Sequence, residues 1–422
     1  MSVGNFVRNE EFSRHRGYMA LIKRFLFQLV LVAVGLLILF NSLPIFAFAA
    51  SSKDLEVAGW IPYWNESKGI VDAQQNINKV DMVFPFSFTT KEDGTLKDLA
   101  DMKGSEWGKF ISLAHVKGVK IVPTVMWSDA SSTHANLSDK DLRKSHVSNI
   151  VEMVKDGGYD GVDIDYESKF STTKEHFSAF LTELKKALGK NKILACTIEA
   201  RTPPASLYKK IPDPLLYAND FVVIGSVCDR VEIMAYDQQR ADLKLNDIRS
   251  GMPYIPVSDV AWVEKVVKLA LVDIPREKIL LGIPSYGHQY TVTVGPNWFK
   301  DYKRIGALNI PDILDIANEY SVRPTRNAAG EMSFSYIPKS SKFTFPRNLK
   351  IPRGTKNGDK VAAQALAYAN KTGKDVQFNY VSYSDVHAME DKIKLAKDYG
   401  LHGIAFFKFD GEEDQKVWKL LP

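Results

Sequence analysis

Asp160-Gly161-Val162-Asp163-Ile164-Asp165-Tyr166-Glu167 is the stretch that most restricts the fold of this 422-residue chain. Successive side chains of a β-strand point to opposite faces, so Asp163, Asp165 and Glu167 would share one face, about 6.6 Å apart. The apolar and aromatic residues between them would lie on the other face. The stretch is therefore predicted to be a strand with one acidic face and one face packed against helices.

Seven other apolar stretches of similar length occur along the chain. With the acidic strand they form this series: Val57–Trp64, Val80–Thr89, Val119–Trp127, Tyr159–Glu167, Lys192–Arg201, Arg230–Asp237, Ile279–Gly287 and His402–Asp410. Between them, apolar residues recur three and four positions apart, as in Leu142–Val154, Phe177–Leu188 and Val260–Leu271, and predict helices. Alternating strands and helices favour a parallel sheet, and eight such units favour an α/β fold, the closed (β/α)8 TIM barrel.

The spacing fails once, between the seventh and eighth strands. Gln289–Val381 is too long for one loop and one helix, and it contains strand-like pieces at Met332–Ile337 and Phe378–Val381. We expect an α+β insertion at about residues 289–381, beside the barrel mouth. Ala388–Lys397 would be the helix before the last strand.

The acids on the fourth strand need an explanation, because the interior of a parallel barrel is normally filled by Val, Ile and Leu. One explanation is an exposed acidic strand or a cluster of ion pairs, and another is a site for magnesium or calcium. The third is that desolvation and mutual repulsion raise the pKa of one acid. We favour the third, which makes Glu167 a candidate general acid at the C-terminal mouth of the barrel.

Composition and charge exclude several classes of protein. Hydrophobic residues make up 45% and charged residues 25% of the chain, which is ordinary globular usage. The net charge is +5, but residues 1–49 supply +3 of it, so the remainder shows no basic excess for nucleic acid. Cys196 and Cys228 can form at most one disulfide bond, and no zinc or nucleotide-binding motif occurs. We expect no cofactor, no metal and a monomer.

Residues 1–49 have the pattern of a targeting segment. The apolar run Phe25–Phe40 is broken only by Gln28, follows a cationic stretch and precedes Ala47-Phe48-Ala49. This order is typical of a cleaved secretory signal peptide. Counted through Ala50, the stretch is also long enough for an uncleaved, single-helix membrane anchor. Either alternative places residues 50–422 outside the cytoplasm, secreted or held at the outer face of the membrane.

The octapeptide resembles the DxxDxDxE signature of glycoside hydrolase family 18, the chitinase-like barrels. Other segments resemble further motifs of that family in the same order: Met234-Ala235-Tyr236-Asp237, Gly282-Ile283-Pro284-Ser285-Tyr286-Gly287, Tyr383-Ser384-Asp385 and Gly403-Ile404. The resemblance extends from about Val57 to the C-terminus, and an insertion between strands seven and eight is a known variant of that fold.

The resemblance implies a substrate-assisted reaction, an exception among glycosidases. Glu167 would protonate the leaving glycosidic oxygen and later act as base for water, while the substrate's own acetamido oxygen attacks the anomeric carbon. Asp165 would orient the acetamido N–H, and Asp163 would hold or share its proton. Tyr236 would donate to the acetamido oxygen, and Asp237 would contact the sugar.

Further sugar contacts are expected from Met234, Tyr63, Trp64, Tyr286 and Phe407. Phe407 stands where the family usually has a Trp on the eighth strand. The family's SxGG at the end of the third strand is replaced by Thr124-Val125-Met126-Trp127. Here Trp127, Trp64 or Tyr286 could supply the stacking surface that sugars need.

The resemblance favours a retaining glycosidase that cleaves β-1,4-linked N-acetylglucosamine-containing glycans, either chitin oligosaccharides or peptidoglycan. One alternative is a non-catalytic chitinase-like sugar-binding protein at the cell surface, and another is a barrel with unrelated metal-dependent chemistry. Arg201, at the end of the fifth strand, could contact a substrate carboxylate or pair with an internal acid.

Overall fold

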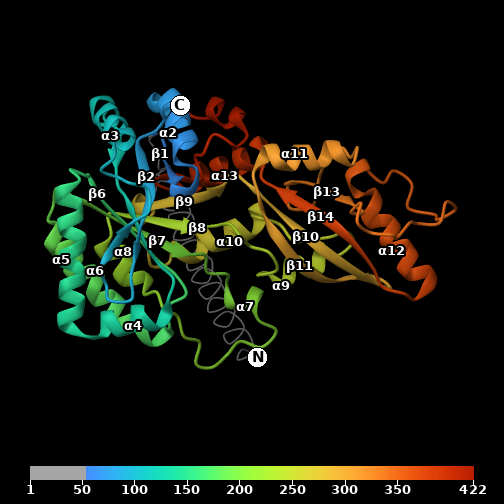
Figure 1. Cartoon of the computed structure of the whole chain (residues 1–422). Helices are drawn as coiled ribbons and strands as arrows, with labels where there is room; N and C mark the ends of the chain where they lie inside the picture. The colour runs from blue at the N-terminus through green and yellow to red at the C-terminus, as the bar shows by residue number, and fades with distance from the viewer. Residues whose placement is uncertain (1–53) are drawn as a thin grey trace, which may run out of the picture. The chain divides into compact units, whose positions relative to one another are not determined.

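The computed structural model describes residues 54–422 (Figure 1). Its larger sheet contains a ring of eight parallel strands: β1 (Glu56–Pro62), β2 (Met82–Thr90), β5 (Thr124–Trp127), β6 (Gly161–Tyr166), β7 (Ile193–Glu199), β8 (Arg230–Met234), β9 (Ile279–Pro284) and β15 (Gly403–Phe407). Each strand pairs with its neighbours in this series, and β1 pairs with both β2 and β15, which closes the ring. The predicted (β/α)8 barrel is confirmed.

Helices connect the strands and cover the outside of the ring (Figure 1). The main ones are α2 (Glu66–Gln75), α3 (Ser105–Lys117), α4 (Ala130–Ser138), α5 (Lys140–Asp156), α6 (Lys174–Leu188), α8 (Phe221–Val227), α10 (Val260–Ala270) and α13 (Val386–Asp398). In α10 the side chain of Asp259 caps the first turn, and Trp262, Val263 and Val266 lie on its buried face. This spacing of three and four residues is the reason that the sequence predicts the helix.

Several predicted strand bounds differ from the observed ones, and three of these differences bear on the site. The third predicted strand divides into β4 (Lys120–Ile121) and β5, because Pro123 between them has no N–H to donate to the sheet. The first strand ends at Pro62 and a 3-10 turn follows. The sixth ends at Met234, and Asp237 has a φ of +53°, which a strand cannot accommodate.

The side chains of β6 point alternately to the helices outside the barrel and to the barrel interior. Val162, Ile164 and Tyr166 pack in the core between barrel and helices. Asp163 and Asp165 point into the barrel and are buried. The rest of the barrel interior is largely apolar and includes Ala58, Trp60, Met82, Phe84, Leu280 and Ala405. The acids therefore face a medium that contains few polar groups.

A second, antiparallel sheet lies between β9 and β15 in the chain, where the sequence predicts an α+β insertion (Figure 1). It consists of β10 (Gly287–Gly295), β11 (Trp298–Leu308), β12 (Thr325–Arg326), β13 (Met332–Tyr336) and β14 (Val376–Tyr383), with α11 (Ile310–Glu319) and α12 (Lys360–Thr372). The first residue of β10, Gly287, pairs with the last residue of β14, Tyr383. The insertion thus leaves and re-enters the barrel at one point, just after β9.

The predicted targeting segment, residues 1–49, lies outside the described residues. Among residues 54–422, no helix combines the length and the apolar character needed to cross a bilayer.

Cys196 on β7 and Cys228 after α8 form a disulfide bond, with 6.1 Å between their Cα atoms. The bond joins residues 32 positions apart.

Closing a loop of this length stabilises the folded state by about 3–4 kcal/mol in the chain-entropy account. We expect reduction to lower the free energy of unfolding by that amount, measured by urea denaturation with and without dithiothreitol. The Cys196→Ala/Cys228→Ala variant is the control, and a response to reductant of equal size in that variant would contradict the assignment.

Candidate active site

The deepest acid of the site is Asp163, in the middle of β6. Its carboxylate accepts hydrogen bonds from Thr124 Oγ1 at 2.8 Å, Thr197 Oγ1 at 2.9 Å and Trp60 Nε1 at 3.2 Å. Burial nevertheless raises the pKa of Asp163 to about 6, because these three donors only partly replace water. Asp163 is therefore anchored to three other strands of the barrel.

Asp165 lies two residues further towards the mouth and is also buried. Burial raises its pKa well above the ordinary range, and the nearby charges of Glu167 and Asp163 raise it further. Its Oδ1 atom has no hydrogen-bond partner within residues 54–422. The raised pKa favours the protonated form of Asp165, and its Oδ1 is an acceptor that a bound molecule can contact.

Glu167 follows the last residue of β6. Its backbone N–H donates to the carbonyl oxygen of Trp127 at 2.8 Å, which fixes the start of the loop. Burial raises the pKa of the Glu167 carboxyl, and the negative charge of Glu199 adds to the effect. A carboxyl group with a raised pKa at the C-terminal end of a barrel strand is suited to donate a proton.

Two charged neighbours act on Glu167 in opposite directions. Glu199, the last residue of β7, accepts hydrogen bonds from Ser168 N at 3.0 Å and from Asn219 Nδ2 at 2.8 Å. Lys169 is buried, donates to the carbonyl oxygen of Tyr166 and lies 4.5 Å from the ring centre of Phe177. Its positive charge lowers the pKa of Glu167, while Glu199 raises it.

The loop after β8 supplies the opposite wall. The ring of Tyr236 stacks on Phe407, with 5.7 Å between ring centres and an angle of 26°. Asp237 accepts hydrogen bonds from Tyr286 Oη at 2.7 Å and from His288 Nε2 at 2.6 Å. Burial tends to raise the pKa of Asp237, but the contacts with His288 and Tyr286 and the charge of Arg304 together outweigh it and hold the pKa below the ordinary value. The site therefore combines one carboxyl group whose pKa is lowered with two whose pKa values are raised.

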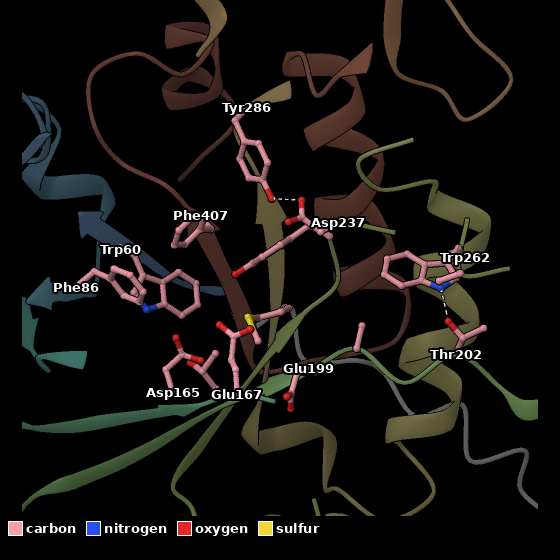
Figure 2. Close-up of a pocket in the computed structure, with 15 residues that line it drawn as sticks. Trp60, Phe86, Asp165, Glu167, Glu199, Thr202, Asp237, Trp262, Tyr286 and Phe407 are labelled. Carbon is pink, nitrogen blue, oxygen red and sulfur yellow. Dashed lines mark hydrogen bonds between the residues drawn. The ribbon is translucent and has the colours of Figure 1, made fainter. Parts of the chain in front are cut away.

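These groups surround a cavity of about 360 Å³, within the size range of small-molecule sites (Figure 2). Its lining consists of Trp60, Phe86, Asp165, Glu167, Thr197, Glu199, Ala200, Thr202, Met234, Tyr236, Asp237, Ala241, Trp262, Tyr286 and Phe407. Figure 2 shows Asp165 and Glu167 side by side. The aromatic rings of Trp60, Phe86 and Phe407 form one side of the cavity, and Asp237 and Tyr286 lie on another side. The cavity combines proton donors with flat apolar surfaces, as a sugar requires.

Most predicted site residues meet in this cavity. Seven line it: Asp165, Glu167, Met234, Tyr236, Asp237, Tyr286 and Phe407. Asp163 lies behind them. Tyr63 and Trp64 are not part of the lining; they occupy the 3-10 turn after β1 and are exposed. The Trp64 ring packs edge-on against Phe86 with 5.8 Å between ring centres, which places it at the rim.

Two other residues considered from the sequence lie outside this cavity. Trp127 is buried outside the barrel, where it packs against Tyr166 and donates to Ser132 Oγ at 3.0 Å, so it offers no surface to a sugar in the cavity. The guanidinium of Arg201 lies between the rings of Tyr217 and Phe221, at 3.6 and 3.8 Å from their centres. It neither pairs with an internal acid nor lines the cavity.

Sequence reasoning missed several residues of the site. Trp60 supplies the aromatic floor, and strand alternation in β1 could have indicated it. Glu199 and the buried Glu232 are acids on barrel strands, which is the same signal that identifies the acids of β6. Trp262, predicted to be a packing residue, lines the cavity and donates to Thr202 Oγ1 at 2.7 Å. The contact between His288 and Asp237 had no sequence signal, because it joins the insertion to the barrel.

The geometry of the described residues also bears on metal binding. Within residues 54–422, no group of three or more His, Cys, Asp and Glu side chains is arranged to hold a metal ion.

Comparison with known proteins agrees with this architecture. YdhD of Bacillus subtilis is 27% identical over 164 residues, which are 39% of this chain and 35% of that protein. The cortical fragment-lytic enzyme of Bacillus anthracis is 23% identical over 361 residues, covering 84% of this chain and 70% of that protein. The solved structure of a chitinase from Chromobacterium violaceum superposes with a TM-score of 0.63 at 20% identity, covering 86% of this chain and 97% of that one.

The sequence model described as Glycosyl hydrolases family 18 matches residues 56–412, which include all eight barrel strands and the insertion. The chain therefore belongs to family 18 of the glycosyl hydrolases.

Proposed function

We propose that this protein hydrolyses β-1,4-linked glycans that contain N-acetylglucosamine, with retention of configuration and with Glu167 as general acid and base. One observation carries the proposal: Glu167 and Asp165, whose pKa values are raised, share one cavity with Asp237, whose pKa is lowered, and Asp165 Oδ1 has no hydrogen-bond partner among the described residues. Acids whose environments push their pKa values apart are typical of acid–base catalysis.

The first step uses the proton of Glu167. That proton passes to the glycosidic oxygen as the C–O bond breaks, and the acetamido oxygen of the same sugar attacks the anomeric carbon. Asp165 Oδ1 accepts the acetamido N–H, and the Tyr236 hydroxyl donates to the acetamido oxygen. The cyclic intermediate carries a positive charge, which Asp165 stabilises as its own proton moves towards Asp163.

The second step reverses the proton transfer. Glu167, now a carboxylate, takes a proton from a water molecule as that water attacks the anomeric carbon and opens the ring of the intermediate. Attack on the same carbon twice, from opposite faces, retains the configuration. Trp60 and Phe407 support the sugar from below, and Asp237, held by Tyr286 and His288, contacts its hydroxyl groups.

We further propose that residues 1–49 direct the protein out of the cytoplasm and that residues 50–422 form the catalytic unit. The support for export is the apolar run after a cationic stretch, together with the Cys196–Cys228 bond. Disulfide bonds persist in oxidising compartments.

Replacing Glu167 by Gln tests the catalytic assignment. We expect the release of reducing ends from soluble chitooligosaccharides and from peptidoglycan to fall by at least about 100-fold, because no proton reaches the leaving oxygen. The Kd of Glu167→Gln for chitooligosaccharides, measured by calorimetry, is the control and should stay close to that of the wild type. A wild-type protein that binds these glycans and cuts none of them would show that the protein is a sugar-binding relative.

Substitutions of Glu199 and of Lys169 are expected to shift the pH dependence of activity in opposite directions. The general acid must be protonated, so activity is lost as pH rises through its pKa. Glu199→Gln removes a negative charge, and the alkaline limb of kcat/KM should move to lower pH. Lys169→Met removes a positive charge, and the same limb should move to higher pH. Shifts in the same direction for both variants would contradict the assigned roles.

A further inference from the structure

A second cavity of about 530 Å³ lies beside the catalytic one. It is lined by the segment after α7 (Pro204–Leu207), by α9 (Leu243–Ile248) and by β11 of the insertion. Thr202 and Ala241 line the catalytic cavity, while Ala205 and Arg240 line the second one. In the loops after β7 and β8, the residues that line the two cavities are thus at most three positions apart in the chain.

The second cavity is positively charged. Its lining includes Lys209, Arg240 and Lys244 but a single acid, Asp247. The Arg240 guanidinium lies 5.1 Å from the ring centre of Tyr302 on β11, so this cation is held at the wall by an aromatic face. Within residues 54–422 none of the three cations takes part in an ion pair, whereas the nearby Lys265 pairs with Asp242 at 2.5 Å.

The cavity also contains an unsatisfied acceptor. Asn246 on α9 is 7% exposed, and its Nδ2 donates to the carbonyl oxygen of Arg240 at 3.0 Å. Its Oδ1 is buried and has no hydrogen-bond partner among the described residues. A buried acceptor without a partner destabilises the protein, so a ligand that brings an N–H or O–H to this atom gains binding free energy.

An aromatic rim completes the cavity. Trp298, at the start of β11, lines it and is 55% exposed, which is unusual for so large an apolar side chain. An exposed indole next to free cations is typical of binding surfaces. The ligand that fits is therefore anionic, carries an N–H donor and has an apolar portion.

We propose that this cavity binds an acidic peptide substituent of the glycan, so that the preferred substrate is a peptide-bearing glycan such as peptidoglycan. This inference rests on the proposed function and names the substrate class of the same site. Peptide carboxylates pair with Lys209, Arg240 and Lys244, and a peptide N–H donates to Asn246 Oδ1. Chitin has no anionic group to offer. A phosphate polymer has the charge but lacks N–H donors for Asn246.

Binding measured in the Glu167→Gln background tests the proposal without relying on turnover. The probes are soluble peptidoglycan oligosaccharides with their stem peptides and the same oligosaccharides after enzymatic removal of the peptides. We expect the peptide-bearing probe to bind about tenfold more tightly, as three partly exposed ion pairs would give. In a Lys209→Gln/Arg240→Gln/Lys244→Gln variant this preference should fall to about one.

Lys210→Gln is the matched control, because Lys210 neighbours Lys209 in the chain and is exposed but does not line the cavity. That variant should keep the preference. Equal affinities of the two probes, or a triple variant that keeps the preference, would overturn the proposal. Competition by polyglycerol phosphate as strong as by the peptide-bearing probe would also overturn it, in favour of a phosphate site. Failure of the wild type to cleave any glycan, with the binding preference intact, would instead reject only the proposed catalysis.

Discussion

The site depends on the energetic cost of placing carboxylates inside a closed barrel. Asp163 and Asp165 cannot both be ionised at such proximity in an interior otherwise filled by groups such as Trp60, Phe84 and Leu280. The barrel lowers this cost in two ways: three donors bind Asp163, and the raised pKa of Asp165 favours its uncharged form. The low polarity that makes the acids costly to bury also raises their pKa values. A raised pKa favours the protonated form, which a proton donor requires.

At the mouth of the barrel, one negative and one positive side chain act on the pKa of Glu167. Glu199, at the end of β7, and Lys169, two residues after Glu167, act on the pKa of Glu167 with opposite signs. Asp237 is kept ionised by His288, a residue of the insertion. One wall of the cavity thus carries carboxyl groups with raised pKa values and the other carries one with a lowered pKa, and this difference depends in part on residues that lie outside the family signature.

The insertion contacts a residue of the catalytic cavity and lines part of the second cavity. Because it starts and ends just after β9, its first strand lies next to the catalytic mouth and its second strand forms a wall of the cationic cavity. His288 and Tyr302 are the residues that make these two connections. The barrel therefore supplies the proton chemistry, while the insertion contributes to orienting Asp237 and to the surface on which substituents of the substrate would bind.

The sequence alone determined the barrel and its acids, since strand alternation is local and β6 displays it without ambiguity. Placing Asp163, Asp165 and Glu167 on one face requires only the two-residue repeat of a strand. Contacts between distant segments were decided only by the tertiary structure. Trp127 packs outward because the contact of Thr124 with Asp163 sets which residues of β5 face the barrel interior, and Tyr63 and Trp64 leave the cavity because β1 ends at Pro62. Neither the joining of Cys196 to Cys228 nor the meeting of His288 with Asp237 could be predicted, because each pair becomes adjacent only when the chain closes on itself.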